Sequence, residues 1–187
     1  PGACGEVLLG SCIVLHEVVP VYHACAVIVP IPCDEVDSVF ALNSSQHSAI
    51  EIRQHLDALS RGCRHFIIGI GGSATNDAGI GMLTALGYHF YQEDGSRVKG
   101  YGRDLAKIVR IDDSEVSPLL RECRFDIACD VTNPLCGSEG CSHVFGPQKG
   151  ATPEIAARMD ADIARFAALA ERFTGKAAAL VPGAGAA

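Results

Sequence analysis

The feature that most constrains the fold of this chain is an apolar strand, a glycine-rich turn and an amphipathic helix in direct succession over residues 65–87. Residues 65–70 form a continuous apolar run, which is typical of a strand buried on both faces of a parallel sheet. A helix is predicted over 76–86, because apolar side chains recur there at helical spacing and Gly87 can end it. A strand that leads directly into a helix is the repeating unit of α/β proteins.

Other segments continue this alternation. Strands are predicted at 25–31, 107–111, 125–129 and, as a short extended piece, 143–145. Residues 88–98 predict a hairpin around Asp94-Gly95, which is the strongest local hairpin signal in the chain. Apolar side chains at helical spacing predict a helix over residues 44–60.

The best-defined helix is predicted over residues 153–173. Thr152 can cap its first turn, Pro153 suits its first position, and Gly175 can end it. Strands that alternate with helices predict an α/β fold with a parallel or mixed sheet flanked by helices.

Charge and hydropathy exclude two classes of partner. The formal net charge is −7, whereas a nucleic-acid interface needs a basic face. Glu17, Pro20 and Pro30 interrupt the apolar stretch near the amino terminus, so it falls short of the roughly 20 apolar residues of a membrane span. We therefore expect neither nucleic acid nor a membrane as a partner.

The chain contains nine cysteines, an odd number, and no visible signal peptide. This combination predicts reduced thiols in a cytoplasmic protein rather than a disulfide framework. Cys136 and Cys141 are the closest pair in the sequence. A zinc site that includes them, and with it a redox or metal-binding protein, stays an alternative.

The glycine-rich turn is the first candidate site. Its polar and glycine residues are Gly71, Gly72, Ser73, Thr75, Asn76 and Asp77. Glycines let a backbone approach a ligand closely, and unpaired N–H groups at a helix start favour anions. The turn therefore predicts a site for a phosphorylated or carboxylated small molecule. The alternative is a tight strand-to-helix turn in which Asn or Asp caps the helix.

The second candidate site follows the predicted strand 125–129. Asp130 comes directly after the strand, with Asn133 three residues further on. A carboxylate in this position can hold Mg²⁺ or accept the proton of a substrate hydroxyl. The alternative is an Asx-turn that leads into Pro134.

The third candidate site is a loop just before the capped helix, where Gln148 and Lys149 are followed by Gly150. A lysine on a glycine-flanked loop can reach a phosphate as a point charge. The alternative is an ordinary solvated lysine.

Four motifs follow one another along the chain: GIGGSATNDAGIGMLTALG, ACDVTNPLCG, FGPQKGA and VPGAGAA. By their order and spacing, the sequence resembles the bacterial glycerate kinase family over about residues 50–187. The resemblance implies ATP-dependent phosphorylation of D-glycerate, at its 2- or 3-position, with Mg²⁺. It also implies two α/β domains with a cleft between them. Whether the protein is a monomer or a homodimer stays open.

The resemblance assigns roles motif by motif. Gly71, Gly72, Ser73, Thr75, Asn76 and Asp77 should line the cleft. Asp130 and Asn133 should lie near the reacting hydroxyl or the metal, and Gln148 and Lys149 near phosphate. Asp130 is the preferred catalytic base or Mg²⁺ ligand; Asp77 is either a second catalytic acid or a cap that holds the turn. Because both acids follow neighbouring strands, their carboxylates should face one shared cleft.

The sequence departs from the family pattern in three places. Ala78 replaces a usual glycine, residues 44–50 (SSQHSAI) lack the expected glycine-containing loop, and residues 1–42 match poorly. We therefore separate a β-rich segment, 1–42, from a glycerate kinase-like region, 43–187. The family's N- and C-terminal segments are missing, so we expect a fragment of a longer kinase. The alternative to an active kinase is a catalytically incomplete fragment that keeps the fold and binds anions weakly.

Overall fold

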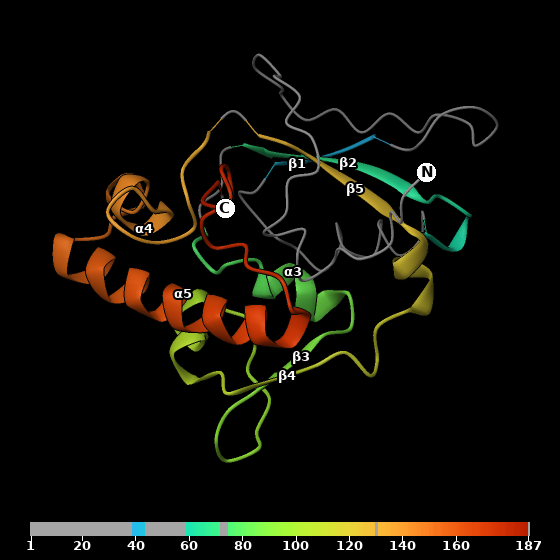
Figure 1. The fold of residues 1–187 in the computed structure, drawn as a ribbon, viewed down its shortest axis with the longest axis horizontal. Helices are drawn as coiled ribbons and strands as arrows, with labels where there is room; N and C mark the ends of the chain where they lie inside the picture. Colours follow the sequence, from blue (N-terminus) through green and yellow to red (C-terminus); the bar gives the residue numbers. More distant parts are fainter. Residues whose placement is uncertain (1–38, 44–58, 72–74, 130, 187) are drawn as a thin grey trace.

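The computed structural model describes residues 39–43, 59–71, 75–129 and 131–186 (Figure 1). The predicted strand at 25–31 and nearly all of the predicted helix at 44–60 lie outside these residues. The strands and α-helices of the described residues follow in the order β1 (Val39–Asn43), β2 (His65–Gly71), α3 (Ile80–Ala85), β3 (His89–Tyr91), β4 (Arg110–Asp112), β5 (Arg124–Ala128), α4 (Cys141–Val144) and α5 (Pro153–Thr174). Three 3₁₀ helices connect them: η1 (Gly102–Lys107), η2 (Pro118–Glu122) and η3 (Pro147–Lys149).

The described part of the chain contains a parallel sheet in the order β1-β2-β5. The two apolar runs predicted as buried strands form β2 and β5, and Phe66 pairs with Phe125 across them. The two rings stack with their centroids 5.1 Å apart, and both side chains are buried. The α/β class and the parallel sheet predicted from the sequence are confirmed.

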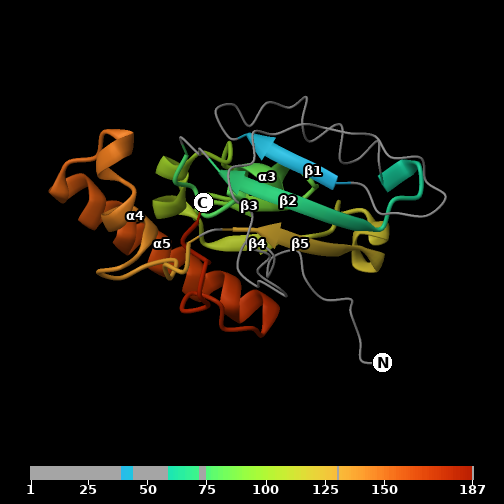
Figure 2. The ribbon, with the colours of Figure 1, turned by 90° about the horizontal axis from the view of Figure 1, so that it is seen from above.

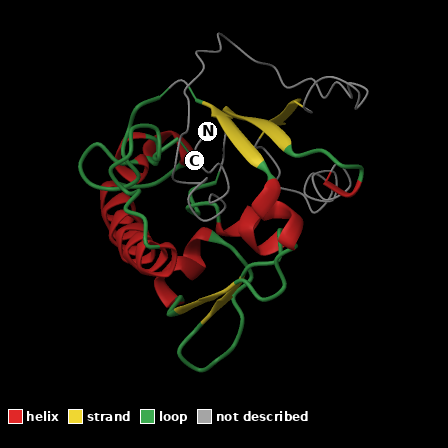
Figure 3. Cartoon of the chain, turned by 45° about the vertical axis from the view of Figure 1, so that its right-hand side comes forward, coloured by secondary structure: helices red, strands yellow, loops and turns green. Residues whose placement is uncertain are grey.

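A second, antiparallel pair of strands, β3 and β4, lies apart from this sheet, and α3 lies between the two (Figures 1 and 3). The predicted hairpin is present in part. Its turn forms, and Tyr91 makes an isolated bridge to Arg97. However, the main partner of β3 is β4, which pairs Phe90 with Ile111.

Helix α5 has the ends that the sequence predicts. Thr152 Oγ1 accepts a hydrogen bond from Ile155 N at 3.3 Å, and Gly175 ends the helix with φ 72°. Its buried face packs on the β3–β4 layer, where Phe166 meets Phe90 edge to face at 5.8 Å. No helix within the described ranges combines the length and apolar character that a membrane span requires.

One predicted helix starts later than expected, and one predicted extended segment is wrong. The helix predicted over 76–86 begins only at Ile80, because Ala78 and Gly79 have left-handed φ angles of 50° and 75° that a right-handed helix excludes. The segment 143–145, predicted as extended, lies at the end of α4, where Val144 N and Phe145 N donate to carbonyls four residues back. Short apolar runs do not distinguish a strand from a buried helical turn.

Candidate active site

The carboxyl ends of β2 and β5 lie at one edge of the parallel sheet. Gly69 pairs with Ala128, so the glycine-rich turn and the loop after Cys129 leave the sheet side by side. Both strands point toward the side of the molecule where α4 and the carboxyl-terminal segment lie (Figures 1 and 2). Open α/β sheets bind ligands at this edge. Gly72, Ser73 and Asp130 lie outside the described residues, so the shared orientation of the Asp77 and Asp130 carboxylates stays a prediction.

Lys149 turns back onto the glycine-rich turn. Its Nζ donates a hydrogen bond to the carbonyl oxygen of Thr75 at 2.5 Å, across 74 residues of sequence. The side chain is partly buried, and this burial lowers the pKa of its ammonium, while nearby Cys141 and Asp77 act in the opposite direction. Lys149 is therefore a fixed, half-buried cation at the end of the turn, unlike an ordinary solvated lysine.

Asn76 is held from the other side by α4. Its Nδ2 donates to Ser142 Oγ at 2.9 Å, and its Oδ1 accepts from Cys141 Sγ at 3.2 Å. Cys141 and Ser142 are 2% and 0% exposed, so both polar groups of the amide are satisfied inside the protein. The hydrogen bonds of the Asn76 side chain thus serve to fix the turn.

Asp77 is a helix cap. Its Oδ1 accepts from Gly79 N at 2.9 Å and its Oδ2 from Gly81 N at 3.2 Å, while its carbonyl oxygen accepts from Ile80 N. The first N–H groups of α3, which would otherwise favour an anion, are therefore already paired. This geometry supports the capping role of Asp77 over a second catalytic acid.

Ala78 is strained in this turn. Its φ is 50°, and it is the one non-glycine residue with positive φ in the described part of the chain. A left-handed conformation costs an L-residue about 1–2 kcal/mol, whereas glycine adopts it freely. If glycine is the usual residue here, as the resemblance implies, Ala78 is a backbone change as well as a change of one methyl group.

The second and fourth motifs are joined through Asn133. Its carbonyl oxygen accepts from Gly183 N at 3.2 Å and Gly185 N at 2.9 Å, and its Nδ2 donates to Glu139 O at 2.9 Å. A Cβ atom at Gly185 would lie 2.1 Å from the carbonyl oxygen of Pro134, so only glycine fits this contact. Asn133 therefore holds two loops together at the sheet edge.

The remaining candidates do not join this cluster. Gln148 is exposed on η3. Within the described ranges, no three His, Cys, Asp or Glu side chains gather as a metal site would require. Burial raises the pKa of the Cys123, Cys136 and Cys141 thiols, so the metal-free thiols are less easily deprotonated than an exposed cysteine. These observations weigh against the zinc alternative on Cys136 and Cys141.

Sequence reasoning missed Cys141 and Ser142, the side chains that hold Asn76. Residues 143–145 were predicted as extended, and no local pattern marks Cys141 and Ser142 as partners of a turn 65 and 66 residues away. In the structure, the backbone at Gly140 packs so tightly on Cys136 that a Cβ atom would lie 2.6 Å away. This compact turn is a tertiary contact that the sequence pattern did not show.

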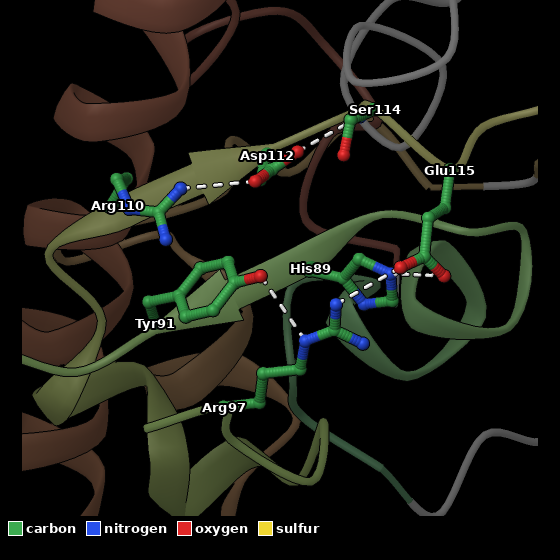
Figure 4. Close-up of polar contacts among 7 residues, drawn as sticks. All are labelled: His89, Tyr91, Arg97, Arg110, Asp112, Ser114 and Glu115. Carbon is green, nitrogen blue, oxygen red and sulfur yellow. Dashed lines mark hydrogen bonds and ion pairs between the residues drawn. The ribbon is translucent and has the colours of Figure 1, made fainter. Parts of the chain in front are cut away.

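A separate polar cluster lies on β3, β4 and the adjoining turns (Figure 4). Glu115 bridges His89 Nε2 at 2.9 Å and Arg97 Nη2 at 3.0 Å, and hydrogen bonds from these two residues lower its pKa. The Arg110 guanidinium lies over the Tyr91 ring, with its Cζ atom 3.7 Å from the ring centroid. The Glu115, Arg97 and Arg110 side chains are more than half exposed. This charged surface contains none of the predicted site residues.

The fold and the site together define an α/β protein in which a glycine-rich turn and a lysine-bearing loop meet at the carboxyl edge of a parallel sheet. The model of the glycerate kinase family matches residues 54–187. The chain belongs to the glycerate kinase family.

Relatives and a solved structure agree with this assignment. A glycerate kinase of Haemophilus influenzae is 50% identical over 130 residues, which are 70% of this chain and 34% of that protein. The glycerate 2-kinase of Escherichia coli K12 is 43% identical over 132 residues, 71% of this chain and 35% of that protein. The crystal structure of a protein provisionally named glycerate kinase 2, from Salmonella typhimurium LT2, superimposes with a TM-score of 0.69 at 42% identity and covers 84% of this chain and 40% of that one. The chain spans about a third of the length of the curated relatives it matches.

Proposed function

We propose that this chain is part of an ATP-dependent glycerate kinase, and that it contributes a phosphate-facing cation and the glycine-rich turn to the active site. The family membership and the named relatives support this function. The observation that carries it is the half-buried Lys149 ammonium, fixed at the end of the turn by Thr75 O. Because the E. coli relative is named a glycerate 2-kinase, 2-phosphoglycerate is the product to assay first.

Phosphoryl transfer asks the protein for positioning and for neutralisation of charge, and for little covalent chemistry. A lysine acts on a phosphate as a point charge, and its effect is stronger where burial keeps water away. The Lys149 side chain is partly buried, which strengthens the effect of its charge. Its Nζ also lies at the sheet edge where open α/β sheets bind substrates. In this proposal Lys149 binds a phosphate of ATP.

Two of the described site residues that carry oxygen atoms, Asp77 and Asn133, already accept hydrogen bonds within the chain. Mg²⁺ is usually bound by one or two carboxylates together with phosphate oxygens and water. Both oxygens of Asp77 accept backbone N–H groups, and the Asn133 carbonyl accepts two more. The proposed role of metal ligand or base therefore stays with Asp130, and the role proposed for Lys149 does not depend on a metal.

The test is a chimera in which residues 54–187 of this chain replace the matching segment of the H. influenzae glycerate kinase. We expect glycerate-dependent formation of ADP and phosphoglycerate by the chimera, and little or none by the 187-residue chain, because catalytic groups that act as a unit fail together. A folded but inactive chimera, beside an active parent, would contradict the proposal.

Two further measurements complete the test. Lys149→Met in the chimera should raise the KM for ATP by about tenfold or more, the loss of one charge-assisted contact. Calorimetric titration of the 187-residue chain with glycerate, and separately with Mg-ATP, shows whether this piece keeps weak anion binding without catalysis.

A further inference from the structure

The hydrogen bonds around Ser142 form a closed ring. Ser142 Oγ accepts from Asn76 Nδ2 at 2.9 Å, and Ser142 O accepts from Gly146 N at 3.2 Å. Gly146 O in turn accepts from Lys149 N at 2.9 Å. The Lys149 side chain then returns to Thr75 O, whose carbonyl belongs to the peptide group that continues into Asn76.

The backbone packs closely on both segments that the ring connects. Ser142 is fully buried, and a Cβ atom at Gly146 would lie 2.1 Å from its carbonyl oxygen. On the opposite side, a Cβ atom at Gly102 would lie 2.5 Å from the carbonyl oxygen of Asn76. Both the turn and the loop are thus clamped by close backbone contacts. A packed interior of this kind transmits a shift of one member to the next.

We propose that Ser142 is a positioning residue that sets the location of the Lys149 ammonium. Its hydroxyl acts through Asn76 on the turn, while its backbone carbonyl, which Ser142→Ala retains, holds Gly146 on the loop that carries the lysine. The use of that ammonium to bind a phosphate rests on the proposed kinase function, but the positioning itself does not.

A purely structural role would predict a different outcome. If Ser142 only satisfies a buried amide, its removal destabilises the fold and leaves the ammonium where it is. If Ser142 positions the lysine, its removal lets the turn relax and the ammonium moves toward water. Burial is the first cause that lowers the Lys149 pKa, and the groups that oppose it are Cys141 and Asp77. The Lys149 pKa in the folded chain therefore distinguishes the two roles.

The experiment follows the Lys149 pKa by NMR of the labelled lysine side chain in the 187-residue chain. In Ser142→Ala we expect the pKa to rise toward 10.5, the ordinary lysine value, because desolvation is relieved. Asn76→Ala removes the same hydrogen bond from its donor side, together with the contact from Cys141 Sγ, and should raise the pKa as well; the double variant should add nothing further.

The matched control is Thr174→Ala, which removes a hydroxyl that donates to Ala170 O at 2.9 Å near the end of α5, outside the ring. It should leave the Lys149 pKa unchanged. An unchanged pKa in folded Ser142→Ala would overturn the proposal. Should Ser142→Ala not fold, Asn76→Ala and the near-isosteric Ser142→Cys are read in its place, with the same two outcomes.

The chimera separates this inference from the proposed function. There, Ser142→Ala should raise the KM for ATP, and the same change made in Lys149→Met should have less than about a twofold further effect, because both act on one group. A shifted Lys149 pKa with an inactive chimera would support positioning and contradict the kinase function. A Lys149 pKa that Ser142→Ala leaves unchanged, together with an active chimera, would support the kinase function and contradict positioning.

Discussion

Two polar networks in this molecule, the ring around Ser142 and the cluster around Tyr91, differ in burial and in charge. The ring around Ser142 is partly or fully buried and is made mostly of backbone groups, with one amide, one hydroxyl and the Lys149 ammonium. The cluster around Tyr91 is dominated by charged side chains, and its Glu115, Arg97 and Arg110 side chains are more than half exposed (Figure 4). An exposed ion pair gains little because water and salt screen it, whereas a buried polar group is costly to leave unpaired. The network around Ser142 is therefore the one that can hold a functional group in place.

The pKa shifts in the two networks have different causes. Desolvation lowers the pKa of the Lys149 ammonium, because burial disfavours its charged form. Hydrogen bonds from Ser114 and then Arg110 lower the pKa of Asp112 to about 2, because these donors favour its charged form. The lowered Lys149 pKa indicates an ammonium removed from water. The lowered Asp112 pKa indicates a carboxylate whose charge is stabilised by neighbouring hydrogen-bond donors.

The largest expected effect is a loss of turnover at Asp130, compared with a substitution in the exposed cluster. In the active chimera, Asp130→Asn should lower kcat by about 10² or more, the low end of what loss of a general base costs, with little change in melting temperature. The matched control is Asp112→Asn, which makes the same substitution at another aspartate, in the exposed cluster, and should leave kcat unchanged. Near-normal turnover of Asp130→Asn would remove Asp130 from the catalytic role proposed for it.

The second prediction compares one hydroxyl in each network. Ser142→Ala should lower the free energy of unfolding by about 1–3 kcal/mol, because the Asn76 amide loses its buried acceptor. Ser96→Ala removes a hydroxyl that donates to Asp94 in an exposed turn, and should have a much smaller effect because water replaces it. Urea denaturation of both variants measures the difference, and equal losses would contradict the contrast drawn here.

The third prediction concerns the strained residue of the glycine-rich turn. Ala78→Gly should raise the free energy of unfolding by about 0.5–1 kcal/mol, because relief of the left-handed strain exceeds the entropy cost of glycine. A control, Ala179→Gly, lies outside the positive-φ positions and should not stabilise the chain. A destabilised Ala78→Gly would show that the Ala78 methyl group, which is buried, contributes more than the strain costs.

The smallest expected effect is the pH dependence of the exposed cluster. The folded pKa of Asp112 lies below its ordinary value, so its contribution to stability is present above pH about 4 and is lost as pH falls toward 2. Asp112→Asn should therefore lower the melting temperature slightly at pH 5 and leave it unchanged near pH 2. The difference at pH 5 should shrink at high salt, because the Arg110–Asp112 pair is exposed. A difference that persists at pH 2 would exclude this titration as its cause.

The sequence by itself determined the elements whose signals are local. The apolar runs that became β2 and β5, the cap at Thr152 and the end of α5 at Gly175 all depend on residues within one turn or strand of each other. It also determined the family and pointed to Lys149 and Asn76, because the four motifs keep their order and composition.

The tertiary structure decided what those motifs do to each other. Asn76 meets Ser142 across 66 residues, and Lys149 meets Thr75 across 74, so neither contact leaves a periodic trace in the sequence. The same holds for the late start of α3 and the helical form of α4, where left-handed backbone and close glycine packing override the apolar pattern. Spacing along a chain encodes which face of an element is buried, but the partner on that face is chosen only when distant segments pack together.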